Sequence, residues 1–224
     1  MSEVINREGT KVPFQGIKRT AARHMVNAWQ APVFHLTVEV DMTEAVKVKQ
    51  VVPGATLTDL LVSVAAQALI AVPELNVHVE EDGVVQFASA GVGIAVAAPH
   101  GLTVPVIHEA NSLSLSEIAE RRKDVVERAR TGALTRADIT GGTFTISNLG
   151  MMGVRRFDAI VNVPQAAILA VGSTEQRLRL VDGEPTWLPI AEFTLTCDHR
   201  AIDGALGATF LQKFVQLLES PLAN

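Results

Sequence analysis

The stretch IAEFTLTCDHRAIDGALGATFLQKFVQLL, residues 190–218, decides the fold of the carboxyl-terminal part of the chain. Residues 190–197 are predicted to form a strand, and residues 205–218 show the apolar spacing of an amphipathic helix. His199 lies in the turn between them, together with Asp203 and the helix-opening Gly204. A strand-to-helix turn on a rigid scaffold can present a side chain to a ligand, so we expect chemistry at this turn.

The composition indicates one globular domain with ample material for a core, because 48% of the 224 residues are hydrophobic and 19% are charged. The net charge of −5, with scattered basic residues, does not favour a nucleic-acid partner. No apolar run approaches the roughly 20 residues of a membrane helix, and the first residues lack a signal-peptide stretch. We therefore expect a soluble, intracellular protein.

The single cysteine, Cys197, offers neither an internal disulfide nor a metal cluster, so no metal is expected.

Periodicity along the chain predicts an α/β protein. Two capping boxes, Thr56–Asp59 and Ser114–Glu117, mark helix starts, and residues 80–83 and 181–184 indicate turns. The chain has no internal repeat and no long linker, so we expect no second domain. Residues 1–12 are expected to form an arm that docks on a neighbour or stays mobile. Helices are predicted at 21–29, 56–71, 114–130 and 205–218, and strands at 33–40, 92–98, 102–107, 143–147, 167–172, 177–181, 186–189 and 193–197.

A second informative segment is GGTFTISNLG, residues 141–150. In a strand, Thr143, Thr145 and Ser147 point to one face while the apolar residues between them point to the other. A hydroxyl at the end of such a strand can donate a hydrogen bond to a substrate oxygen. The flanking glycines allow close approach of another backbone or a ligand, but they do not match a phosphate-binding glycine motif.

The segments GTFTISNLG (142–150) and DHRAIDG (198–204) together resemble the catalytic domain of dihydrolipoamide acyltransferases, the E2 component of 2-oxoacid dehydrogenase complexes. Four further segments match in the order of that family, and the resemblance runs from about residue 13 to residue 222. These segments are GIKRTAARHM (16–25), VPELN (72–76), GLTVPVI (101–107) and PQAAIL (164–169).

The resemblance implies roles for individual residues. His199 would be the general base that takes the proton from the thiol of coenzyme A, and Ser147 would stabilise the tetrahedral oxyanion. Asp203 would support the turn by holding a basic residue, with Arg19 and Arg23 as candidates, or would cap the last helix. Three residues are candidates for contact with coenzyme A, although the two arginines could also form a solvated helix face: Asn148, Arg121 and Arg122.

The resemblance also implies a fold and an assembly. The family has a two-layer α+β fold like that of chloramphenicol acetyltransferase, a mixed sheet with packed helices, and forms homotrimers in which His199 of one chain would face Ser147 of the next. Trimers of this family commonly build cores of 24 or 60 subunits, so a homotrimer is expected here, with a 24-subunit core as a further possibility. Residues 13–224 would be the acyltransferase domain. Nothing in the chain resembles a lipoyl or peripheral-subunit-binding domain, so lipoamide would come from a separate lipoylated domain or protein, with E1 and E3 components as partners.

The family has several acyl specificities, and SNLGMMG (147–153) is most similar to the acetyl-transferring members of pyruvate dehydrogenase complexes. Branched-chain and acetoin-linked members remain open alternatives, as do a non-catalytic trimeric core and an acetyltransferase for small hydroxylated molecules. The expected compartment is the bacterial cytoplasm or, for a eukaryotic protein, the mitochondrial matrix. Cys197 is interpreted as a buried, inert thiol rather than a nucleophile, and His24 and His35 as structural.

Overall fold

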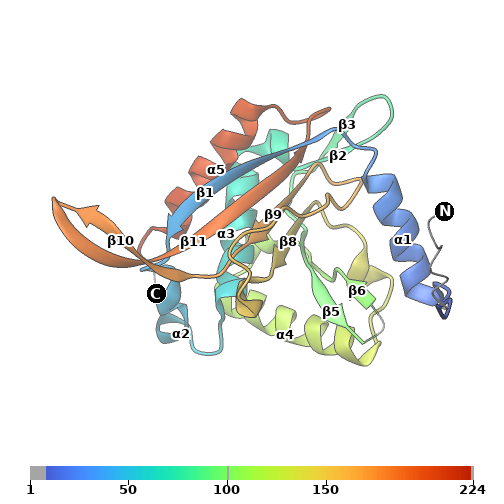
Figure 1. Cartoon of the computed structure of the whole chain (residues 1–224), viewed down its shortest axis with the longest axis horizontal. Coiled ribbons are helices and arrows are strands. Elements are labelled where there is room, and N and C mark those ends of the chain that lie inside the picture. The colour runs from blue at the N-terminus through green and yellow to red at the C-terminus, as the bar shows by residue number, and fades with distance from the viewer. Residues whose placement is uncertain (1–8, 100, 223–224) are drawn as a thin grey trace, which may run out of the picture.

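A seven-stranded mixed sheet forms the centre of the computed structural model, which describes residues 9–99 and 101–222 (Figure 1). The strand order is β1-β11-β9-β8-β4-β7, and β10 pairs with the first half of β11. Strands β4, β8 and β9 are parallel, and the other pairs are antiparallel. The bounds are β1 Val33–Asp41, β4 Val92–Ile94, β7 Val106–Ile107, β8 Phe144–Asn148, β9 Ala167–Val171, β10 Glu175–Val181 and β11 Glu184–Asp198.

Side-chain alternation gives the sheet one apolar and one polar face. Phe144 of β8 and Phe193 of β11 are fully buried and pack on Phe210 and Phe214 of α5 (Gly204–Leu218), with ring centroids 5.5 Å apart in both pairs. Helix α3 (Leu57–Ala71) lies beside α5 on the same core. The opposite face carries threonines such as Thr145, whose hydroxyl donates to the Gln165 amide oxygen at 2.6 Å. The mixed α/β architecture predicted from the sequence is thus confirmed.

Both predicted capping boxes are present and set the starts of two long helices. At α3, the backbone N–H and the hydroxyl of Thr56 both donate to Asp59 at 2.7 Å. At α4 (Leu115–Thr131), the backbone N–H of Ser114 donates to Glu117 at 2.8 Å, and the N–H of Glu117 donates back to the Ser114 hydroxyl. These bonds satisfy amides that the first helical turn leaves free. The hydrogen bond from the Ser114 hydroxyl is the main cause of the lowered pKa of Glu117.

Several predicted boundaries were wrong. Helix α1 (Gly16–Ala28) begins five residues before the predicted start. Residues 92–98 form two strands, because the chain leaves the main sheet after β4 and β5 (Val96–Ala98) pairs with β6 (Gly101–Thr103) instead. Residues 102–107 likewise divide into β6 and β7 around Pro105, which has no N–H for a ladder. The strands predicted at 186–189 and 193–197 are one continuous strand, β11.

Other elements were missed by the sequence-based prediction because they are very short. Helix α2 spans Val48–Val51, and strands β2 (Val77–Val79) and β3 (Val84–Gln86) form a separate hairpin around the predicted 80–83 turn. The first eight residues of the predicted arm lie outside the described residues, and residues 9–12 are exposed. In the described ranges, no helix is long and apolar enough to cross a membrane.

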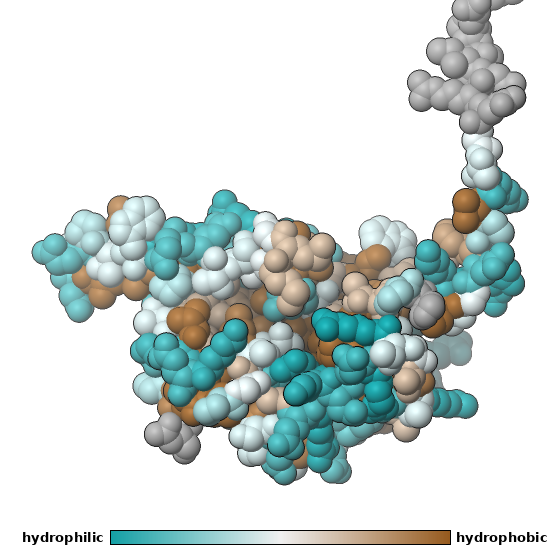
Figure 2. All heavy atoms as spheres, turned by 90° about the horizontal axis from the view of Figure 1, so that it is seen from below, coloured by the Kyte–Doolittle hydropathy of each residue, from teal (hydrophilic) through white to brown (hydrophobic). Residues whose placement is uncertain are grey.

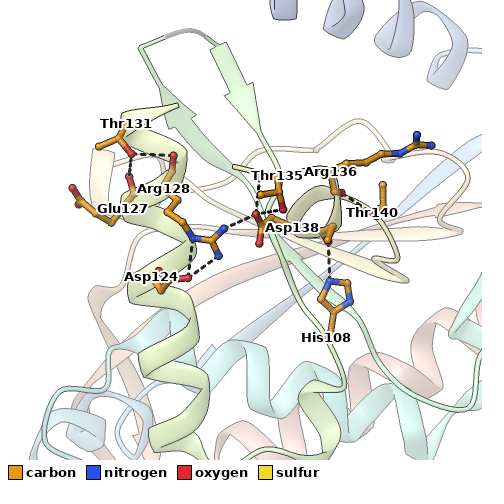
Figure 3. A network of polar contacts seen from close by, with 10 residues as sticks. His108, Asp124, Glu127, Arg128, Thr131, Thr135, Arg136, Asp138 and Thr140 are labelled. Carbon is orange, nitrogen blue, oxygen red and sulfur yellow. Dashed lines mark hydrogen bonds and ion pairs between the residues drawn. The ribbon is translucent and has the colours of Figure 1, made fainter. Parts of the chain in front are cut away.

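The carboxyl-terminal end of α4 is fastened by a network of charged and polar side chains, which Figure 3 shows. Arg128 donates to Asp124 on its own helix at 2.6 Å and to Asp138 of the following 3₁₀ helix at 2.5 Å. Asp138 also accepts from the N–H and hydroxyl of Thr135, both at 2.7 Å. These hydrogen bonds, the one from Arg128 foremost, lower the pKa of Asp138 and raise that of Arg128. Nearby, the His108 ring bonds the Ala137 carbonyl oxygen at 3.1 Å.

A second charged pair joins α3 to α4. Asp59 is fully buried, and Arg122 holds both of its oxygens, with Nε at 2.8 Å and Nη2 at 3.0 Å. Because an unpaired carboxylate in the protein interior is costly, this pair fixes how the two helices pack. The guanidinium of Arg122 therefore has a structural partner, whereas its neighbour Arg121 is exposed.

We expect Arg122→Met to lower the free energy of unfolding by about 3 kcal/mol, because it leaves the buried Asp59 carboxylate unpaired. The matched control is Arg121→Met, which removes an exposed charge from the next position and should change that free energy by less than about 0.5 kcal/mol. Urea unfolding followed by circular dichroism measures both. Equal stability of the two variants would contradict the structural role of the pair.

Candidate active site

His199 lies where β11 ends and the turn to α5 begins, as the sequence predicted. Its backbone N–H donates to the Pro32 carbonyl oxygen at 2.8 Å, which fastens the turn to the start of β1. Its ring packs on Phe34, with centroids 4.8 Å apart and planes at 52°. The residue is exposed, so the imidazole is held from one side and free to meet another molecule from the other.

Ser147 lies near the end of β8 on the polar face of the sheet and is half-buried. The residues that follow it show why the chain turns sharply after this strand. Asn148 accepts a hydrogen bond from the Gly150 N–H at 2.9 Å, and Gly150 passes so close to the Gly172 backbone that a Cβ would lie 2.4 Å from the Gly172 carbonyl oxygen. The close backbone approach expected at the glycines beside Ser147 is therefore present.

The sheet register separates His199 from Ser147 within one chain. Ser147 pairs with Ala170 of β9, which pairs with Thr194 of β11. Two strand spacings place Ser147 roughly 10 Å from Thr194, and His199 follows five residues, or roughly 16 Å, farther along the chain. The two side chains are thus on the order of 20 Å apart. A single chain does not bring the predicted base and the predicted hydroxyl together.

Asp203 is the amino-terminal cap of α5. Its side chain accepts a hydrogen bond from the Leu206 N–H at 2.8 Å, which is the capping alternative raised from the sequence. The expected ion pair with Arg19 or Arg23 does not form among the described residues of this chain, and the Arg19 guanidinium instead donates to the Phe14 carbonyl oxygen at 3.0 Å. Within the described residues of one chain, the Asp203 side chain thus faces a helix amide, and its pairing with a basic residue stays a prediction.

Asn148 borders an open pocket of about 380 Å³ beside the strand that carries Ser147. Met151, Gly172 and the first residues of α3, including Thr58, also line it, and Lys49 of α2 supplies the one cationic side chain. Sequence reasoning missed Lys49, because nothing in the sequence signals that a four-residue helix lies beside β8. Arg121 and Arg122 are not among the residues that line this pocket.

The other titratable side chains near the turn are occupied by structural contacts or buried. His24 bonds the Asn162 amide oxygen, and His35 bonds the Thr196 hydroxyl, both at 2.9 Å. Cys197 is fully buried, and burial raises the pKa of its thiol from 9.0 to about 12. Its thiol is therefore protonated and shielded at neutral pH, in agreement with the interpretation as an inert residue. In the described part of the chain, no group of three or more potential metal ligands comes together.

The chain was compared with known families and structures. Residues 6–223 match the model of the 2-oxoacid dehydrogenases acyltransferase (catalytic domain) family. A relative from Zymomonas mobilis, the dihydrolipoyllysine-residue acetyltransferase component of pyruvate dehydrogenase complex, is 36% identical over 220 residues, which is 94% of this chain and 50% of that protein. The chain thus spans about half the length of the curated relatives it matches.

Solved structures agree with this match. The dihydrolipoamide acetyltransferase of Azotobacter vinelandii superposes with a TM-score of 0.88 at 30% identity, covering 94% of this chain and 91% of that one. The role in its catalytic mechanism of a serine, a histidine and an asparagine, spaced by 52 and 4 residues, has been investigated in that enzyme. The cubic core of a pyruvate dehydrogenase multienzyme complex gives a TM-score of 0.88 at 28% identity, over 94% and 91% of the two chains. Chloramphenicol acetyltransferase, 16% identical with a TM-score of 0.59, shares the fold.

We expect the thiol of Cys197 to resist iodoacetamide at pH 8 in the native protein and to react in urea, because the raised pKa keeps it protonated until the pH approaches about 12. The same shift means that the stability contributed by the buried thiol is fully present below its ordinary pKa of 9.0 and is lost as the pH rises from that value to about 12. Mass spectrometry after timed quenching measures the alkylation. Rapid labelling of the native protein would contradict the burial of Cys197. Loss of activity in a folded Cys197→Ala variant would contradict its interpretation as inert and favour a role as nucleophile.

Proposed function

This chain belongs to the 2-oxoacid dehydrogenase acyltransferase family, and on that premise we propose that it transfers an acyl group, with acetyl favoured, between dihydrolipoamide and coenzyme A. One observation carries the proposal. Ser147, His199 and Asp203 are separated by the same 52 and 4 residues as the serine, histidine and asparagine named for the Azotobacter vinelandii enzyme. The aspartate here replaces an asparagine, and both side chains can cap a helix.

In the proposed reaction, His199 accepts the proton of the coenzyme A thiol. The thiolate attacks the carbonyl carbon of S-acyl-dihydrolipoamide, and Ser147 donates a hydrogen bond to the oxygen that becomes negative. When the tetrahedral intermediate collapses, the bond to the lipoamide sulfur breaks and His199 returns the proton to that sulfur. Loss of the Ser147 donor is expected to raise the barrier by about 2.7 to 4 kcal/mol.

The active site is proposed to form between two chains of a homotrimer. Support comes from the roughly 20 Å that separate His199 from Ser147 within one chain, since the chemistry needs both at one carbonyl. Large hydrophobic side chains that reach the surface, among them Trp29 and Trp187, are 73% and 65% exposed and suit contacts between chains. The face seen in Figure 2 shows hydrophobic residues, in brown, at the surface among hydrophilic ones. The description of a structural neighbour as a cubic core further supports assembly, with 24 subunits as an extension of the proposal.

The pocket beside Asn148 is the proposed site of coenzyme A. Lys49 provides a charge that suits a phosphate, and the Thr58 hydroxyl lies in the same wall. Arg121 and Arg122 lose support as coenzyme contacts, because neither lines this pocket and Arg122 already holds Asp59.

Lipoamide on a separate lipoylated domain or protein is the proposed acyl donor, and E1 and E3 components are the proposed partners. The bacterial cytoplasm or the mitochondrial matrix is the compartment that the same proposal implies.

We expect the chain to acylate free dihydrolipoamide, fastest with acetyl-coenzyme A among the acetyl, isobutyryl and succinyl thioesters. His199→Ala and Ser147→Ala should each lower kcat by at least about 100-fold. Co-expression of the two variants in equal amounts should restore about a quarter of the wild-type rate, because random mixing pairs an intact His199 with an intact Ser147 at one interface in four.

Four outcomes of this experiment would contradict the proposal or a part of it. The proposed reaction would be wrong if the wild type transferred no acyl group to dihydrolipoamide, or if His199→Ala kept full activity. The shared site would be wrong if the co-expressed mixture were no faster than the separate variants. Faster turnover of isobutyryl-coenzyme A would replace acetyl transfer by the branched-chain alternative.

Lys49→Met is expected to raise KM for acetyl-coenzyme A by about tenfold with kcat nearly unchanged, because it removes a charge used for binding in the ground and transition states alike. The matched control is Lys47→Met, two residues earlier, whose amine pairs with Glu44 at 2.6 Å. Steady-state assays at saturating dihydrolipoamide measure both variants. The same KM in the two variants would remove Lys49 from the coenzyme site.

A further inference from the structure

A fully buried carboxylate lies directly before His199. Asp198 has no exposed surface, and its partner is the guanidinium of Arg200, with Nε 3.0 Å from Oδ1 and Nη2 2.6 Å from Oδ2. The Arg200 side chain is 49% exposed on its outer side. The two paired residues thus flank a single residue in the sequence, His199, which is the proposed general base.

Asp198 also organises the backbone of the turn. Its Oδ1 accepts the Arg200 N–H at 3.0 Å, and its carbonyl oxygen accepts the N–H groups of Ala201 and Ile202 at 3.1 and 3.0 Å. Its own N–H donates to the Ala166 carbonyl oxygen at 2.8 Å, which anchors it to the strand beside β11. One residue therefore fixes both ends of the short segment that carries the imidazole.

The His199 ring depends on that segment for its direction. It forms no hydrogen bond with the described residues of its own chain, and its one aromatic contact is with Phe34. With no hydrogen bond to fix it, the position of the ring depends on the Cα–Cβ direction that the backbone sets and on the rotamers that the contact with Phe34 allows. Any rotation of the 198–200 backbone moves the imidazole nitrogens by a comparable amount.

Two other ion pairs with a buried carboxylate join segments that are far apart in the sequence. Asp59 and Arg122 join two helices, and Glu192 of β11 accepts from Arg155, in a loop 37 residues earlier, at 2.9 Å. The Asp198–Arg200 pair joins only positions two residues apart, so it adds no tie between distant elements. Its effect is local, and the one residue that it encloses is His199.

We propose that Asp198 and Arg200 are positioning residues that set the direction of the His199 imidazole for proton transfer. The inference rests on the proposed function, since it assigns these two residues to the same reaction. The planar fork of arginine and the two oxygens of a buried carboxylate fit each other in one orientation, which suits this purpose better than a single hydrogen bond. Asp203, for which such a role was expected, caps α5 instead.

The test compares Asp198→Asn and Arg200→Met with the wild-type protein. Both variants should lower kcat by about 10- to 100-fold while KM for acetyl-coenzyme A and for dihydrolipoamide stays within about twofold, since misdirection of the base affects the transition state alone. Arg200→Lys, which keeps the charge but not the fork, should recover part of the loss. If Asp198→Asn does not fold, Arg200→Lys and Arg200→Met still test the proposal.

The matched control is Arg128→Met, which breaks another arginine–aspartate contact away from the turn and should leave kcat within about twofold of the wild type. An equal fall of kcat in Arg128→Met would overturn the proposal. So would wild-type kcat in a folded Arg200→Met variant. A raised KM with unchanged kcat would also overturn it, because Arg200 would then bind substrate directly.

A second measurement separates this proposal from the proposed function. In protein with ¹⁵N-labelled histidine, the ring signals of His199, assigned with His199→Ala, should move in Asp198→Asn and Arg200→Met and stay in place in Arg128→Met. Unmoved signals in the first two variants would overturn the positioning role whatever the enzyme activity. Absence of acyl transfer by the wild type, with moved signals, would overturn the proposed function and leave the geometric effect standing.

Discussion

The rest of the structure depends on the pairing of β11, whose 15 residues contact three other strands. Its inner residues alternate between Phe193 and Leu195, which face α5, and threonines on the other side. A slip of one residue would turn the aromatic side chains away from the core and bury the threonines against the helices. The core therefore fixes the register of β11, and the register fixes where the strand ends and His199 begins.

That constraint explains why part of the fold and site could be predicted from the sequence. Strand alternation, the two capping boxes and the turn that carries His199 depend on neighbouring residues, so short-range patterns reveal them. Residues 92–98 divide between two sheets because the first half pairs with β7 and the second half with β6. Both partner strands, and Pro105 between them, lie outside the segment, so its own sequence does not reveal the division. Likewise, the position of Lys49 beside Asn148 results from packing between elements about 100 residues apart. Such proximity leaves no local signal.

The two aspartates of the motif show the same distinction. Both lie within four residues of His199, but the resemblance to the family implies a supporting role for Asp203 alone. Burial separates them in the structure, because Asp198 at the end of a central strand is shielded while Asp203 at the start of a surface helix is exposed. A shielded carboxylate needs a cation, and Arg200 is within reach; an exposed one is satisfied by a backbone amide. The division of labour follows from solvent access rather than from residue type.

The geometry of the sheet also links the proposed chemistry to assembly. In a parallel or antiparallel sheet, two residues five positions apart along the strands cannot approach without breaking the ladder, so no hinge within one chain could bring His199 to Ser147. An active site made from these two residues exists only where two chains meet. In the proposed trimer, subunit association contributes to the free energy of the catalytic state, and activity and oligomer stability are expected to depend on the same contacts. Exposed side chains such as Trp29 and Trp187, unfavourable on an isolated chain, are candidates for the contacts between chains on which the proposed site depends.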